Sequence, residues 1–104
     1  MSKDLTIEYN QSEEEIIIKD NDHTIEAVKS NRNNQFGYPI FNLQNWNGSC
    51  TISRTMRGDY FNVLLKLNNS YYKTFKKIED DRDFEIFRNF EEVEKVNGRW
   101  ERVI

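Results

Sequence analysis

Apolar and polar side chains alternate along residues 60–78, YFNVLLKLNNSYYKTFKKI. This two-residue period is that of a half-buried β-strand. Its first half, residues 60–67, presents one apolar face made of Phe61, Val63, Leu65 and Leu67. Its second half, residues 71–78, places Tyr72 and Ile78 on one face and Tyr71 and Phe75 on the other. The short polar connection Asn68-Asn69-Ser70 between the halves predicts an antiparallel hairpin.

The same alternation extends toward the N-terminus. Residues 49–56 place Cys50, Ile52 and Met56 on one face, so residues 49–78 predict a three-stranded meander. Earlier stretches with strand character are residues 5–9, 15–19 and 40–44. Residues 23–29 fit either a strand or a short helix capped by Asp22, and we favour the strand.

Composition supports a β-rich chain. Its 104 residues (12.6 kDa) match one domain, residues 1–104, since domains cluster near 100–150 residues. There are thirteen Asn, which favour turns, and a single Ala, the best helix former. An aromatic content of 13% argues against a disordered chain.

The C-terminal third has a different pattern. Ile86, Phe90 and Val93 are spaced as one helical stripe, and acidic residues precede them, as is favourable at a helix N-terminus. We therefore expect a helix over residues 84–93. Asn97-Gly98 fits either the C-cap of this helix or a type I′ hairpin turn. We favour the cap, because the hairpin would place Glu94 opposite Glu101. Residues 99–104 are then expected to form a last short strand anchored by Trp100.

The predicted fold is therefore α+β. It has an antiparallel sheet of five to seven short strands and one C-terminal helix packed on a face. The predicted centre of the core comprises Phe61, Val63, Leu65, Leu67, Ile86, Phe90 and Val93.

Most kinds of chemistry lack their residues in this chain. Cys50 and His23 are the only thiol and imidazole, and the strand pattern indicates that Cys50 is a buried small hydrophobe. One Cys and one His make a poor zinc site, and no Gly-rich phosphate loop is present. No apolar run reaches a membrane span, and no signal region follows Met1. We expect a cytoplasmic protein that is not an enzyme and needs no metal or cofactor.

Charge is segregated along the chain. Residues 54–77 carry a net charge of +5, whereas residues 1–52 carry −4 and residues 79–94 carry −6. Aromatic residues interleave with the cations of residues 54–77, as in proteins that bind single-stranded nucleic acid. The total charge of −3 is a cancellation between these segments, and it argues against nucleic-acid binding, since such domains are usually basic.

By elimination, the sequence favours a non-enzymatic protein that binds and blocks a larger protein or nucleoprotein with a basic surface. A phage-encoded anti-defence inhibitor or a bacterial toxin-immunity protein is of this class. The alternative is a nucleic-acid-binding β-sheet module; a homodimer through a strand edge stays open. The expected binding residues are Glu79, Asp80, Asp81, Asp83, Arg54, Arg57, Tyr60, Tyr71, Tyr72, Lys73, Lys76 and Lys77.

Overall fold

A computed structural model describes residues 4–21, 23–79 and 82–103. These residues form ten β-strands and no helix. The strands are β1 (Leu5–Asn10), β2 (Glu15–Asp20), β3 (His23–Asn33), β4 (Pro39–Leu43), β5 (Gly48–Arg54), β6 (Tyr60–Leu67), β7 (Ser70–Lys77), β8 (Phe84–Phe87), β9 (Glu91–Val96) and β10 (Arg99–Arg102). The α+β prediction, with five to seven strands and a C-terminal helix, is therefore wrong.

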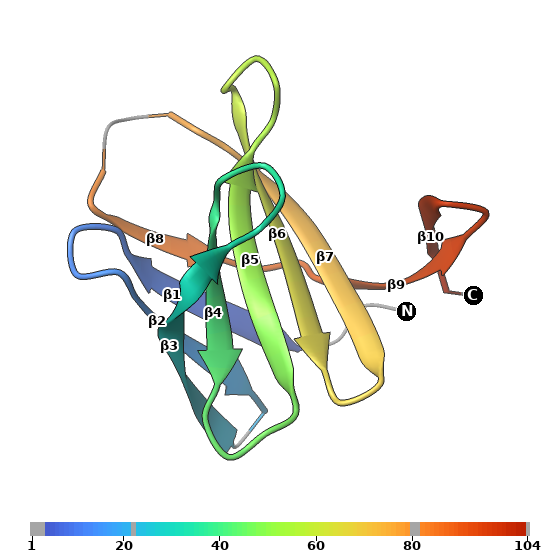
Figure 1. The fold of residues 1–104 in the computed structure, drawn as a ribbon, viewed down its shortest axis with the longest axis horizontal. Helices are drawn as coiled ribbons and strands as arrows, with labels where there is room; N and C mark the ends of the chain where they lie inside the picture. The colour runs from blue at the N-terminus through green and yellow to red at the C-terminus, as the bar shows by residue number, and fades with distance from the viewer. Residues whose placement is uncertain (1–3, 22, 80–81, 104) are drawn as a thin grey trace.

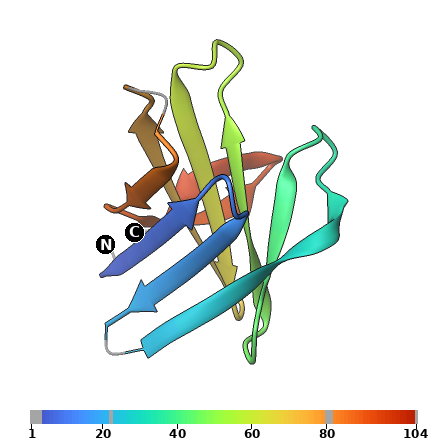
Figure 2. The same cartoon turned by 90° about the vertical axis from the view of Figure 1, so that its left-hand side faces the viewer.

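All ten strands belong to one antiparallel sheet, in the order β10-β9-β7-β6-β5-β4-β3-β2-β1-β8. The sheet curls into a half-barrel, and the chain from β8 to the β9–β10 hairpin runs across the molecule (Figure 1). Figure 2 shows β1, β2 and β3 nearest the viewer, with the β9–β10 hairpin behind β5 and β6. The outer sides of the N-terminal strands and of the β6–β7 region therefore face different directions.

The predicted meander is confirmed as β5, β6 and β7. Strand β6 pairs along its whole length with β7 on one side, and over residues 61–67 with β5 on the other. Residues 23–29 are a strand, as favoured, and lie within β3. The inward side chains form the core, namely Leu5, Ile7, Ile16, Ile18, Ile25, Ala27, Phe41, Leu43, Cys50, Ile52, Phe61, Val63, Leu65, Leu67, Tyr72, Phe87 and Phe90.

A one-residue shift in strand phase explains why residues 84–93 resemble a helix. On β8 the inward side chains are Glu85 and Phe87, but the next inward side chains are Phe90 and Glu92, which faces Tyr72. Asn89 between them has φ of +60°, where the chain leaves β1 and crosses to β7. The step of three residues from Phe87 to Phe90 mimics helical spacing. Ile86 and Val93, expected in the core, are only partly buried.

Asn97-Gly98 forms the hairpin turn between β9 and β10, so the preferred helix cap is wrong. Both residues have positive φ, +51° and +81°, as a type I′ turn requires. Glu94 does lie opposite Glu101, but both are exposed, so water screens their repulsion.

One end of the sheet, β8, approaches β7 at a seam that includes the chain leading from β8 to β9. Strand β9 pairs with the first residues of β7, Tyr71–Lys73. Farther along β7, the Thr74 hydroxyl donates to the Arg88 carbonyl at 2.8 Å. Lys76 Nζ donates to the Ile86 carbonyl at 3.0 Å and lies 2.7 Å from Glu85 Oε2. Side chains of β7 thus hold the curl of the sheet.

Candidate nucleic-acid interface

The outer face of β6, β7, β9 and β10 gathers cations and rings from sequence segments far apart. In an antiparallel pair, residues directly opposite each other share a face of the sheet. Lys66 lies opposite Tyr71, which in turn lies opposite Val93 of β9. Val93 lies opposite Arg102 of β10, so one continuous surface joins these four strands. We call it the cationic face.

Cations outnumber acids on the cationic face. Five basic side chains lie on it, namely Lys66, Lys73, Lys77, Lys95 and Arg102. Four aromatic side chains lie among them, namely Tyr60, Tyr71, Phe75 and Trp100. Among the described side chains of these strands, Glu91 is the one acid on this face, and its Oε2 pairs with Arg102 Nε at 3.0 Å. The other acids of the hairpin, Glu92, Glu94 and Glu101, alternate to the opposite side.

Several lysines of the cationic face lie over its rings. Lys73 Nζ is 4.9 Å from the ring centre of Phe75, and Lys95 Nζ is 5.5 Å from that of Trp100. Trp100 also contacts Tyr71, with 4.9 Å between ring centres and a tilt of 52°. Cation–π attraction between these groups holds the charges beside the rings.

The cations of this face differ in their surroundings. Partial burial lowers the pKa of Lys73, because desolvation disfavours the charged ammonium. Lys77, at the end of β7, is exposed. An anionic ligand beside Lys73 would stabilise the charged ammonium. Binding of the anion would therefore favour protonation of Lys73, and protonation of Lys73 would favour binding of the anion.

The structure gathers four of the sequence-predicted residues on the cationic face: Tyr60, Tyr71, Lys73 and Lys77. Three others lie on the inner side of the sheet. Tyr72 is buried in the core, Lys76 pairs with Glu85, and Arg54 lies over the Phe61 ring at 5.3 Å. Arg57 is exposed in the turn between β5 and β6. Successive residues of a strand point to opposite sides of the sheet. In the run Tyr71-Tyr72-Lys73, Tyr71 and Lys73 therefore lie on the outer side and Tyr72 on the inner side.

The acidic residues expected to bind a partner do not form a helical face. Asp83 holds the β1–β2 turn, since its carboxylate accepts from the Ser12 amide at 2.9 Å and from the Ser12 hydroxyl at 2.6 Å. Glu79 is exposed in the connection after β7. Asp80 and Asp81 lie outside the described residues. The acidic helix that led the sequence interpretation is therefore absent.

Five residues outside the expected binding set complete the cationic face: Lys66, Phe75, Lys95, Trp100 and Arg102. Lys66 and Phe75 share the strand phase of Tyr60 and Tyr71, and this signal was available from the alternation. The three residues of the β9–β10 hairpin reach the face only because β9 pairs with β7 rather than with β8.

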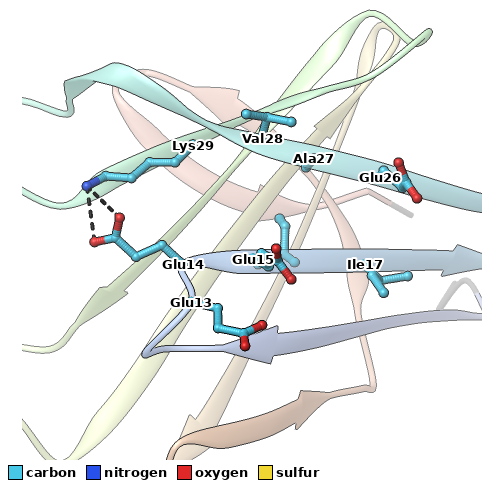
Figure 3. Close-up of a pocket in the computed structure, with 9 residues that line it drawn as sticks. Glu13, Glu14, Glu15, Ile17, Glu26, Ala27, Val28 and Lys29 are labelled. Carbon is cyan, nitrogen blue, oxygen red and sulfur yellow. Dashed lines mark hydrogen bonds and ion pairs between the residues drawn. The ribbon is translucent and has the colours of Figure 1, made fainter.

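The outer side of β1, β2 and β3 carries more acids than bases, since Glu8, Glu15 and Glu26 lie on it with Lys19, which pairs with Glu8. We call it the acidic face. Ile17 lies between Glu8 and Glu26 on neighbouring strands, and Glu15 precedes it on β2. A hollow of about 440 Å³ lies beside them, with exposed Ile17 and Val28 among its lining residues. Figure 3 shows the ion pair of Glu14 with Lys29 at one end of this hollow.

Cys50 is buried as expected, and burial raises the pKa of its thiol to about 12, so it is protonated at neutral pH. Among residues 4–21, 23–79 and 82–103, no group of three His, Cys, Asp or Glu side chains is placed to hold a metal ion. In the same ranges, no helix has the length and hydropathy needed to cross a membrane.

Comparison of the chain with protein-family models, with curated proteins and with solved structures gives no significant match.

Proposed function

We propose that this protein binds single-stranded nucleic acid through the cationic face. The observation that carries the proposal is the concentration of five cations and four rings on one side of β6, β7, β9 and β10, where the one described acid is already paired. Lysine and arginine bind phosphates, and exposed rings stack on unpaired bases. Phe75 and Tyr60 are 55% and 43% exposed, so their rings are available for stacking.

The net charge of −3 does not oppose this proposal as strongly as the sequence suggests. The molecule extends 35 × 33 × 25 Å, and the acidic face lies on the outer side of different strands. Exposed charges farther apart than the Debye length of ~8 Å are largely screened at physiological salt. A strand on the cationic face therefore experiences mainly the local cations.

A single strand suits this face better than a duplex. Bases in a duplex are stacked on one another, and their edges are reached by inserting a helix or ribbon into a groove. A sheet surface with exposed rings instead binds bases that are already unstacked.

We place this activity in the cytoplasm, where the single reduced cysteine is expected to persist.

Replacing Lys73 and Lys77 together by glutamine is expected to weaken binding of a labelled oligothymidylate. The logarithm of the affinity falls linearly with the logarithm of the salt concentration, and each phosphate of a single strand that the protein neutralises adds ~0.7 to the steepness of this slope. Loss of two phosphate contacts in the double variant should therefore make the slope shallower by roughly 1.4. Fluorescence anisotropy at several salt concentrations measures both affinity and slope.

The matched control replaces Lys19 and Lys29 by glutamine on the other side of the molecule. The change in net charge is the same, because each double variant replaces two lysines by glutamine. Lys19 pairs with Glu8 at 2.6 Å and Lys29 with Glu14 at 2.9 Å, away from the cationic face. The control should bind nearly as well as the unaltered protein. No binding at low salt, or an equal loss in both double variants, contradicts the proposal.

A second function is favoured by the acidic face. Ile17 and Val28 are 38% and 57% exposed beside Glu15 and Glu26, and an apolar surface rimmed by like charges is typical of a protein interface. We propose that this face docks a larger protein with a basic surface. This keeps the inhibitory role expected from the sequence but transfers it from the missing helix to β2 and β3.

Reversing the charges of Glu15 and Glu26 to lysine is expected to weaken such a complex roughly tenfold, equivalent to about 1.4 kcal/mol. A pull-down from the native host identifies a basic partner, and calorimetry with that purified partner measures the affinity. The control reverses Glu94 and Glu101, which are exposed on the β9–β10 hairpin. Equal affinity for both double variants would exclude the acidic face.

A further inference from the structure

A second hollow lies beside the cationic face, and its lining differs from that face in chemistry. It has a volume of about 440 Å³, within the range of small-ligand sites. Its described lining contains no charged side chain; it consists of Asn34, Gln35, Phe36, Thr51, Ser53, Asn62, Leu64 and Trp100. A hollow with two rings and several amides and hydroxyls suits a flat, neutral group with a polar edge.

The two rings come from opposite sides of the hollow. Trp100 belongs to β10 and is positioned by its contacts with Tyr71 and Lys95. Phe36 belongs to the loop between β3 and β4 and is 74% exposed. Neither ring is in the core, so both are available to a ligand.

The loop that carries Phe36 is held in one shape by its own hydrogen bonds. Asn34 Oδ1 accepts from the amides of Phe36 at 3.0 Å and Tyr38 at 2.9 Å. The Gly37 amide donates to the Asn34 carbonyl at 2.9 Å, and Gly37 has φ of +87°, which favours glycine. An exposed ring on an ordered turn is already in position for a ligand, which lowers the entropy cost of binding.

Asn62 supplies an unused hydrogen-bonding group at the floor of the hollow. It lies opposite Ser53 of β5 and Phe75 of β7, on the outer side of the sheet. Its Oδ1 is buried and has no hydrogen-bond partner among the described residues. A buried polar atom without a partner costs free energy, and this cost is recovered when a small movement of the amide pairs it with a ligand.

The hollow is continuous with the cationic face at Trp100. That ring also borders the surface depression lined by Lys73, Phe75 and Arg102. A strand whose phosphates contact Lys73 and Arg102 would therefore have the hollow within reach of a neighbouring base.

We propose that the hollow takes one nucleobase between Phe36 and Trp100, and that Asn62 reads the hydrogen-bonding edge of this base. The proposal rests on nucleic-acid binding by the cationic face and adds a specificity-determining residue to it. An amide both donates and accepts, so it distinguishes bases by the pattern of donors and acceptors on their edges.

The test measures affinities of the unaltered protein and of an Asn62→Leu variant for oligodeoxynucleotides of A, C, G or T. The unaltered protein should separate the best from the worst base by roughly tenfold or more, the scale of one good base contact. Asn62→Leu should reduce this difference in affinity to about twofold, mainly by weakening the binding of the preferred base. Asn62→Asp, which keeps the shape but lacks the donor, should change the order of preference.

Two further variants separate base reading from general binding. Phe36→Ala should weaken the binding of all four oligodeoxynucleotides, since stacking of a base on a ring depends little on which base it is. Asn42→Leu, an exposed position on β4 outside the hollow, should change nothing. Equal affinity for all four bases, or an unchanged preference in Asn62→Leu, overturns the base pocket and leaves the proposed function standing. No binding of any oligonucleotide at low salt overturns both.

Discussion

Replacing Phe90 by alanine is expected to lower the free energy of unfolding by about 3–5 kcal/mol, the usual cost of deleting a buried phenylalanine ring. Phe90 is fully buried and lies where the chain crosses from β1 to β7. Pairing on both sides of this crossing limits how far the backbone can collapse into the cavity. Such a loss is a large part of the 5–15 kcal/mol that is typical of a domain.

Urea unfolding followed by tryptophan fluorescence measures the change, and an unaltered dependence on urea shows that the unfolded state is comparable. Phe84→Ala is the matched control, because Phe84 begins β8 and is 49% exposed. It should lose no more than about 0.5 kcal/mol. Similar losses in the two variants would contradict the burial of Phe90.

Replacing Lys76 by methionine is expected to destabilise the protein by about 2 kcal/mol, less than the cost for a fully buried ion pair, because the Lys76 side chain is 38% exposed. The Glu85 side chain is 4% exposed, and Lys76 Nζ lies 2.7 Å from its Oε2. Without Lys76 the carboxylate keeps its desolvation cost and loses its counterion. The variant also loses the bond from Lys76 Nζ to the Ile86 carbonyl.

The double variant Lys76→Met with Glu85→Leu should recover most of this loss, because two apolar side chains at such a site are often as stable as the ion pair. Lys77→Met serves as the control, since the neighbouring Lys77 points to the outer face and is exposed. If Lys76→Met is no more destabilising than this control, Glu85 does not depend on Lys76. Urea unfolding of the four proteins provides the comparison.

The candidate site was partly visible in the sequence. The excess of cations in residues 54–77 and the rings among them pointed to the strands that form half of the cationic face. The alternation places Tyr71 and Tyr72 on opposite faces, yet the expected binding set contained both. Applied to the whole set, it would have removed Tyr72 and Lys76 and added Lys66. The hairpin residues Lys95, Trp100 and Arg102 carried no such signal, because their place depends on the pairing of β9 with β7.

The helix prediction for residues 84–93 failed for a related reason. Periodicity records the spacing of apolar residues within one segment, and it assumes that the segment is a single element. Here two short strands of opposite phase meet at Asn89, and Glu85 points inward because Lys76 of another strand neutralises it. A buried carboxylate is uncommon unless it is paired, and the partner of Glu85 lies on another strand, so nothing within residues 84–93 predicts the burial of Glu85.

By itself the sequence determined the meander of residues 49–78, the buried side of β6 and the segregation of charge along the chain. Each follows from neighbouring residues, whose side chains alternate whatever the rest of the molecule does. Only the tertiary structure decided that β8 pairs with β1, that β9 pairs with β7, and that the β9–β10 hairpin adds Trp100 to the cationic face. These features depend on contacts between residues distant in the chain, whose favourable energy appears only when the sheet curls and buries Phe87 and Phe90.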